Sequence, residues 1–264
     1  SWNQLTKTMQ NGKTASYTYN GDGLRMSKTV DGKTTKHIWD GTDIVGDVTD
    51  GTVTKYIRGL QLISSKNGSN ENFYTYNGHG DVVQLTNNTG AITKQYNYDA
   101  FGVETNKTNN DTNPFRYCGE YYDIETDSVY LRARYYRPTT GRFITEDSYW
   151  NVDNMIYGNS NDKKPNINAI IQSGSLYIYC NSNPVRMIDP DGKYIVDSAA
   201  RNIWRLGAEY YLRNRKGWYL TATLLELSTY GSGQHFEAHN GEYAADLIKY
   251  NSGFRKQVND YLWS

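Results

Sequence analysis

The residues best suited to metal chemistry are two histidines near the end of the chain, in the string Gln234-His235-Phe236-Glu237-Ala238-His239. Histidines four residues apart lie on one face of a helix, where they can share a metal ion. The zinc-protease arrangement, however, requires Glu directly after the first His, and Phe236 holds that place. Glycines at 231, 233 and 241 favour a loop. We therefore expect solvated loop histidines, and a metal site at His235 and His239 remains the alternative.

The rest of the chain offers no cofactor site in its sequence. It has no glycine-rich phosphate loop, no Ser/His/Asp order and no cysteine cluster, and His37 and His79 stand alone, as structural histidines do. Lys and Arg number 28, as do Asp and Glu, so no broad electrostatic footprint for nucleic acid or an anionic membrane is expected. No apolar run reaches the ~18 residues that a membrane span needs.

The two cysteines, Cys118 and Cys180, leave two interpretations open. Each lies beside one of two patterned segments, so a disulfide can tie those segments together. Two buried thiols are the plainer interpretation.

The elements that would position any site are short strands, because a tyrosine motif repeats through the first half of the chain. Tyr-x-Tyr-(Asn/Asp)-x-x-Gly begins at Tyr17, Tyr74 and Tyr96. Alternation puts both tyrosines of each unit on one face of a strand, with buried rings and hydrated hydroxyls. Asp31-Gly32 is a two-residue hairpin signal. Residues 1 to about 110 are predicted to form antiparallel hairpins.

The pattern changes twice further along the chain. Residues 151–175 are rich in Asn and Ser and are predicted to be an inserted surface loop, with one helical turn at INAII as an option. After Gly192 the apolar period becomes 3.6, which predicts a helix from Asp197 or Ser198 to Gly217. Three more helices are expected by the same criterion, over 218–227, over 242–250 and from Ser252 onward.

Two segments carry a family resemblance: GEYYDIETDSVYLRARYYRPTTGRF, which begins at Gly119, and NPVRMIDPDG, which ends at Gly192. With the tyrosine repeats, they resemble the Rhs/YD-repeat proteins, whose relatives include toxin-complex C components and teneurins. The resemblance implies a hollow β-shell closed by a core segment, with a variable effector after the Asp-Pro-x-Gly turn. The fold class is then mainly β, antiparallel YD-repeat hairpins forming part of a β-shell, followed by a small α-helical C-terminal region.

The resemblance also implies a catalytic site, since some members release the effector by aspartyl-type autoproteolysis just past that turn. Matched residue by residue, the two carboxylates are Asp147 and Asp189, with Arg142 as the supporting basic residue. One carboxylate acts as base and the other as acid on a water molecule. The chain departs from the family at Ser148, where Pro is usual, and at Lys193, where Leu is common. The alternative is that both aspartates only cap turns.

The expected organisation is 1–116 YD-repeat hairpins, 117–192 core with its insert, and 193–264 an effector region. Since the chain starts within the pattern and without Met, we take it as a piece of a longer protein, and the effector as incomplete or short. The expected partners are its own effector segment inside the shell and an immunity protein, and the expected location is secreted or at the cell surface. The alternative function is a non-catalytic surface protein whose tyrosine-lined hairpins bind carbohydrate or another cell.

Overall fold

The computed structural model describes residues 4–10, 12–108, 111–147, 156–157, 164–165, 174–193 and 195–198. The chain divides into two compact units. The first unit comprises Ser1–Tyr149, Leu176–Val185 and Pro190–Lys193, and the second comprises Trp150–Ser175, Arg186–Asp189 and Tyr194–Ser264.

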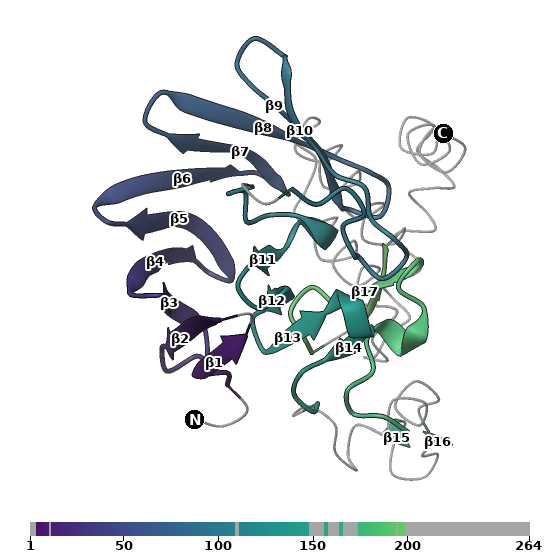
Figure 1. Cartoon of the computed structure of the whole chain (residues 1–264). Coiled ribbons are helices and arrows are strands. Elements are labelled where there is room, and N and C mark those ends of the chain that lie inside the picture. Colours follow the sequence, from purple (N-terminus) through teal and green to yellow (C-terminus); the bar gives the residue numbers. More distant parts are fainter. Residues whose placement is uncertain are drawn as a thin grey trace, which may run out of the picture. The chain divides into compact units, whose positions relative to one another are not determined.

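Ten strands of the first unit form one antiparallel sheet in which the spatial order follows the chain order (Figure 1). They are β1 (Lys7–Gln10), β2 (Lys13–Tyr19), β3 (Arg25–Val30), β4 (Lys33–Asp40), β5 (Asp43–Thr49), β6 (Thr52–Arg58), β7 (Leu62–Asn67), β8 (Asn70–Tyr76), β9 (Val82–Thr86) and β10 (Ile92–Gln95). The predicted run of antiparallel hairpins is confirmed. The Asp31-Gly32 turn is confirmed as well: Val30 pairs with Lys33, and both turn residues have positive φ, 48° and 85°.

The repeated motif makes the same loop each time, because its Asn or Asp binds the backbone ahead of it. The side-chain Oδ1 accepts from the N–H groups two and four residues on, at distances of 2.8–3.1 Å for Asn20, Asn77 and Asp99. The glycine three residues on has a φ between 83° and 97°, in the left-handed region that favours glycine. The motif thus reverses the chain through contacts within four residues.

The tyrosines of the motif face inward, but their hydroxyls are not hydrated as expected. Tyr17 and Tyr96 are buried, and the hydroxyl of Tyr17 donates to Glu125 at 3.2 Å. The hydroxyl of Tyr76 donates to the carbonyl of Leu62 at 2.7 Å. Burial raises the pKa of Tyr19 to about 12, so its phenol stays protonated and bound. The interior is sealed by tyrosines whose polar ends bind within the protein.

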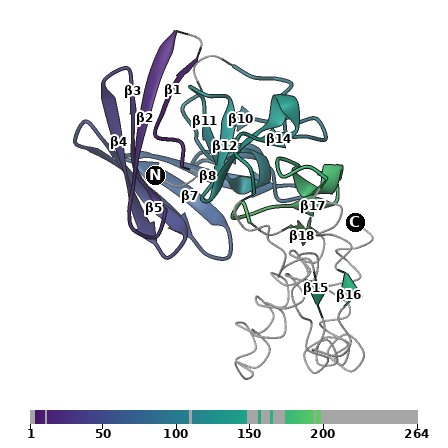
Figure 2. The same cartoon turned by 90° about the horizontal axis from the view of Figure 1, so that it is seen from below.

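A four-stranded sheet lies inside the curve of the ten-stranded one (Figures 1 and 2). Its strands are β11 (Tyr121–Asp123), β12 (Ser128–Leu131), β13 (Arg134–Arg137) and β14 (Arg142–Phe143), accompanied by the 3-10 turns η1 (Tyr117–Gly119), η2 (Pro138–Thr140) and η3 (Cys180–Ser182). Five tyrosines of this core segment, residues 117–147, are buried: Tyr117, Tyr121, Tyr130, Tyr135 and Tyr136. Tyr121, Tyr130 and Tyr135 join Ile44, Tyr56 and Leu62 of the large sheet in one apolar cluster.

The two sheets of the first unit are joined by buried charge. Arg25 of β3 and Asp123 of β11 are both fully buried; Arg25 donates to both carboxylate oxygens, and Lys28 adds a third contact at 2.9 Å. Burial alone would raise the pKa of Asp123, but Arg25 and Lys28 outweigh it and lower the pKa. The guanidinium carbon also lies 4.2 Å from the ring centre of Tyr130.

Beside this pair, the hydrogen bonds of His37 determine its tautomer. Arg25 Nε donates to His37 Nε2 at 3.1 Å, so that nitrogen carries no proton, and Nδ1–H donates to Asp47 at 2.6 Å. Asp47 accepts from Tyr56 and Tyr121 as well. Burial lowers the pKa of His37, and the Arg25 charge adds to this against the opposing Asp47 carboxylate.

The described parts of the second unit are two short antiparallel pairs. β15 (Ile156–Tyr157) pairs with β16 (Lys164–Pro165), and β17 (Met187–Ile188) pairs with β18 (Val196–Asp197). The insert is therefore not entirely loop. The sequence did not predict β15 and β16, because strands of two residues are too short to show an alternation of apolar and polar residues. The helical turn at INAII and the helices expected after Ser198 lie outside the described residues. No helix in the described part of the chain is long and apolar enough to cross a membrane.

We predict that His37 makes stability fall in mild acid. Its folded-state pKa lies below the ordinary value of about 6.5, so the unfolded chain binds the proton first and the unfolding free energy decreases as pH drops below about 6.5. His37→Asn keeps a donor for Asp47 but removes the titration, so its urea midpoint should vary less between pH 7 and pH 5. Equal pH slopes in the two proteins would contradict the assignment.

Candidate functional site at the Asp-Pro-Asp-Gly turn

The core segment holds three successive carbonyls of the Asp-Pro-Asp-Gly turn with three successive residues of its own. Arg132 Nη1 donates to the carbonyl of Pro190 at 2.7 Å, the Ala133 N–H donates to that of Asp191 at 3.1 Å, and Arg134 Nε donates to that of Gly192 at 2.5 Å. All six residues belong to the first unit. We call these three bonds the carbonyl grip.

The tight turn between β12 and β13 supplies the grip. Arg132 has a φ of 56°, a left-handed conformation that reverses the chain between Leu131 and Arg134, which pair in register. The Ala133 N–H also donates to Leu131 at 2.6 Å. This geometry directs two arginine side chains and one backbone N–H toward the same stretch of chain.

Gly192 is required where it lies. Its φ is 75°, and a Cβ there would lie 2.6 Å from the carbonyl oxygen of Leu131 and 2.9 Å from the backbone nitrogen of Arg134. Both clashes are with backbone, which cannot yield as the end of a flexible side chain can. Only glycine lets the turn approach the core segment closely enough to be held.

Each gripping arginine is itself held by a carboxylate. Arg132 forms an ion pair with Glu120 and also donates to the carbonyl of Thr42 at 3.1 Å. Burial opposes the charge of Arg132, but Glu120 more than offsets this and raises its pKa. Arg134 is almost fully buried, lies 3.3 Å from Asp147 Oδ2 and rests 3.6 Å from the ring centre of Phe143. These contacts hold both guanidinium groups in place against the turn.

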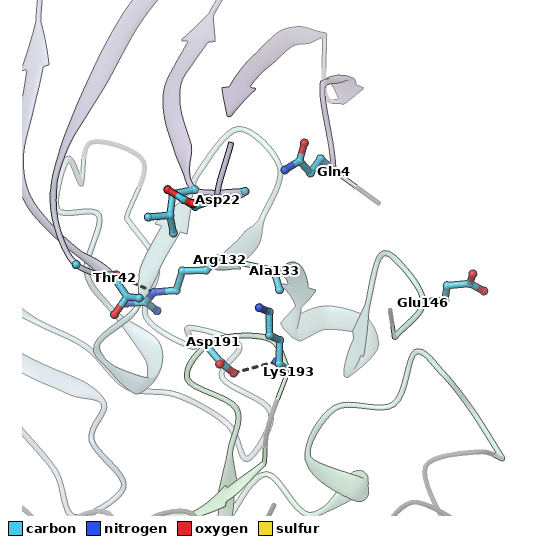
Figure 3. A pocket seen from close by; sticks show the side chains of 11 residues that line it. Gln4, Asp22, Thr42, Arg132, Ala133, Glu146, Asp191 and Lys193 are labelled. Carbon is cyan, nitrogen blue, oxygen red and sulfur yellow. Dashed lines mark hydrogen bonds between the residues drawn. The ribbon is translucent and has the colours of Figure 1, made fainter. Parts of the chain in front are cut away.

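A cavity of about 740 Å³ opens beside the grip (Figure 3). Its charged lining residues are Asp22, Arg132, Glu146, Asp191 and Lys193. The side chain of Asp191 accepts from the N–H of Lys193 at 3.0 Å, which turns the chain at the cavity wall. The cavity thus lies at the point where the chain leaves the grip, with these charged side chains at its border.

The site residues expected from the sequence lie as follows. Asp147 is buried, and the basic residue against it is Arg134; Arg142 has an exposed side chain in β14, where it pairs in register with Arg137. Asp189 is buried and belongs to the second unit, whereas Asp147 belongs to the first, so a proton shared between them stays a prediction. His235 and His239 lie outside the described residues.

Arg134 is the functional residue whose role the sequence did not single out. It binds both a backbone carbonyl, that of Gly192, and a carboxylate, that of Asp147. Its signal was the Arg-Ala-Arg spacing in LRARYY, which places two arginines astride a turn. The carboxylates Asp123 and Glu125 of the core segment pair with Arg25 and Lys28 of the large sheet.

The two cysteines are reduced and buried. Cys118 Sγ lies 3.7 Å from the hydroxyl of Tyr179. The structure therefore agrees with the second interpretation of the sequence, two buried thiols and no disulfide between Cys118 and Cys180.

Comparison with known proteins identifies the architecture. Residues 4–185, more than half of the chain, match the teneurin YD-shell family. The chain belongs to the teneurin YD-shell family. Its tyrosine-repeat sheet and core segment are part of an Rhs-type shell scaffold, as the resemblance implied.

Two curated relatives from Bacillus are much longer than this chain. The tRNA nuclease WapA of Bacillus subtilis (strain 168) is 34% identical over 200 residues, covering 72% of the chain and 8% of WapA. The tRNA(Glu)-specific nuclease WapA of Bacillus subtilis subsp. natto is 35% identical over 241 residues, covering 87% of the chain and 10% of the relative. The chain therefore spans about a tenth of the length of these relatives.

A solved YD-shell structure has the same fold. The crystal structure of TcdB2-TccC3-TEV superimposes with a TM-score of 0.52 at 20% identity, over 72% of this chain and 10% of that one.

We predict that Gly192→Ala releases the turn from the carbonyl grip. The added Cβ must move the turn or the core segment, a cost of about 1–3 kcal/mol, which corresponds to roughly 5- to 150-fold in the population of the open turn. Tryptic cleavage after Lys193, followed by mass spectrometry, should accelerate accordingly. Gly32→Ala is the matched control, because Gly32 has a similar φ of 85° and no atom near its Cβ position. Equal cleavage rates in the wild type, Gly192→Ala and Gly32→Ala would contradict the role assigned to Gly192 in the carbonyl grip.

Proposed function

We propose that this chain is the shell and core of a toxin carrier, and that the polypeptide after Gly192 is the effector that the shell encloses and delivers. The observation that carries the proposal is the carbonyl grip. Two arginines and a backbone N–H of the core segment donate hydrogen bonds to the chain at Pro190, Asp191 and Gly192. The resemblance places the start of the effector at this border. Such a fixed point suits a carrier, because it holds the start of the cargo at a defined place on the core segment.

The names of the relatives support a carrier role. Three relatives, each 34–35% identical, are named as nucleases, two of them for different tRNA substrates, tRNA3(Ser) and tRNA(Glu). A region shared by proteins with different substrates does not itself set the substrate. That is what a scaffold common to several effectors predicts. We extend to this chain the partners that such a role requires: its own effector segment, an immunity protein that neutralises it, and release as a secreted or cell-surface protein.

Among the residues that the structure describes, the tyrosines favour the carrier over the carbohydrate-binding alternative. Sugar stacking needs open aromatic faces. The rings of Tyr17, Tyr96 and Tyr121 are buried, and the hydroxyls of Tyr74 and Tyr98 are bound to Asn113 and to the carbonyl of Val82. The tyrosines of the repeats are used to close the interior.

We further propose that Asp147 and Asp189, with Arg142 as the supporting basic residue, release the effector by hydrolysis next to Gly192. One carboxylate takes a proton from water, whose oxygen adds to the carbonyl carbon, and the other protonates the departing nitrogen as the C–N bond breaks. If the cleaved bond is Gly192–Lys193, Arg134 stabilises the transition state. Its Nε–H already donates to the carbonyl oxygen of Gly192, the atom that gains negative charge when water adds. Its ion pair with Asp147 links the grip to one of the two carboxylates.

The carrier function is tested in the parent protein. Its segment after Gly192 is expressed in a bacterial host, alone and together with the gene immediately downstream. We expect growth arrest from the segment alone and rescue by the downstream gene. A harmless segment would contradict the proposal and favour adhesion.

Autoproteolysis is tested on the purified chain by intact mass. We expect a fragment ending at or just past Gly192, and a single uncut chain for Asp147→Asn and for Asp189→Asn. Asp22→Asn is the control, because this exposed carboxylate lines the neighbouring cavity without being assigned a role. An uncut wild-type chain, or cutting that both substitutions leave unchanged, would refute the proposed hydrolysis and leave the carrier function standing.

A further inference from the structure

Two tight turns from distant parts of the first unit lie against each other. One spans Asn77 to Asp81, the motif loop between β8 and β9, and the other spans Arg116 to Glu120 around η1. The Val82 N–H donates to the carbonyl of Arg116 at 3.0 Å. The approach is close enough that a Cβ on Gly119 would lie 3.4 Å from the carbonyl oxygen of Gly80.

Three side chains with different metal-binding atoms meet where these turns touch. A ring nitrogen of His79, a carboxylate oxygen of Asp81 and Sγ of Cys118 all lie within 4.8 Å of one another. Asp81 and Cys118 are buried, and His79 is nearly so. Three donors within this spread can surround one ion, since metal–ligand distances are about 2.0–2.3 Å.

The backbone presets the positions of these donors. Cys118 has a φ of 55°, held by the 3-10 turn, and its N–H donates to Asp81 Oδ1 at 2.9 Å. Asn77 donates to Asp81 Oδ2 at 2.8 Å, and His79 Nδ1 lies 2.9 Å from Oδ1. The carboxylate thus orients both the thiol-bearing residue and the imidazole, the role that a carboxylate plays beside metal-bound histidine.

One atom of this arrangement lacks a partner. His79 Nε2 is buried and makes no hydrogen bond, although the other ring nitrogen is bound and the ring lies 5.5 Å from that of Tyr117. A buried polar nitrogen without a partner is uncommon in folded proteins and costs free energy. The imidazole therefore has bonding capacity that the described protein contacts do not use.

We propose that His79, Asp81 and Cys118 form a binding site for a Zn²⁺-class divalent ion. The donor set selects the metal: imidazole and thiolate suit Zn²⁺ and its analogue Co²⁺, whereas Ca²⁺ and Mg²⁺ require oxygen ligands. Binding displaces the thiol proton of Cys118, so uptake of the ion releases protons.

The ion acts as a clip between the repeat sheet and the core segment. His79 and Asp81 come from a repeat loop, and Cys118 lies 37 residues further along than Asp81. A ligand that binds only the assembled state stabilises that state by mass action. The clip would therefore fasten the core segment inside the shell.

The experiment uses the purified full chain, stripped with a chelator under reducing conditions and titrated with Co²⁺ and with Zn²⁺. We expect one equivalent of Co²⁺ with a thiolate-to-cobalt charge-transfer band, displaced by Zn²⁺, and a higher melting temperature with Zn²⁺. His79→Gln and Cys118→Ser should each lose the band and weaken affinity by more than the about 10- to 100-fold that is typical of changes outside the ligand shell. Cys180→Ser is the matched control, a buried thiol outside the cluster, and should keep both.

Three outcomes would overturn the site. The first is less than stoichiometric cobalt without a thiolate band. The second is a band that survives in Cys118→Ser, which would place the ion at another thiol or elsewhere. The third is a band that Cys180→Ser abolishes as fully as Cys118→Ser does. Circular dichroism of the metal-free variants distinguishes lost ligands from lost folding.

Discussion

A fully buried guanidinium cannot persist without partners, and this constraint binds the two sheets of the first unit together. Arg25 belongs to the third strand of the repeat sheet, and its carboxylate partner, Asp123, lies 98 residues further along, in the first strand of the core segment. Either charge left alone in the interior would cost about 3–5 kcal/mol, a large part of the stability of a typical domain. The repeat sheet and the core segment therefore complete one another, and neither has a finished interior by itself.

The tyrosines make this mutual dependence tolerable. A sheet lined with aliphatic side chains could not admit Arg25, Lys28 and His37 without leaving donors unsatisfied. Phenol rings cover the apolar surface, and their hydroxyls supply the remaining hydrogen bonds: Tyr130 accepts from the N–H of Arg25, and Tyr121 donates to Asp47. The tyrosine-rich composition is thus a consequence of enclosing charge within β-structure.

What the sequence predicted well is what local chemistry determines. The Asn/Asp-x-x-Gly loops and the Asp31-Gly32 turn depend on contacts within about four residues, so their spacing in the chain reveals them. The pairing of Arg25 with Asp123 depends on how a whole sheet curves, and no local pattern encodes it. The same holds for Arg134, because no local pattern shows that its side chain binds the carbonyl of Gly192. Asp147 and Asp189 were chosen by resemblance, and the structure adds Arg134 as the charge partner of the first.

The carbonyl grip recognises backbone oxygens, and this has a consequence for how such chains diversify. A peptide carbonyl is the same whatever side chain accompanies it, and the only side-chain restriction that the grip imposes is at Gly192, where the left-handed turn and the close approach exclude a Cβ. The three bonds do not depend on the identity of any residue beyond Lys193. Recombination after Gly192 can therefore exchange the whole downstream sequence in one step. The carbonyl grip remains intact without any compensating change in the shell.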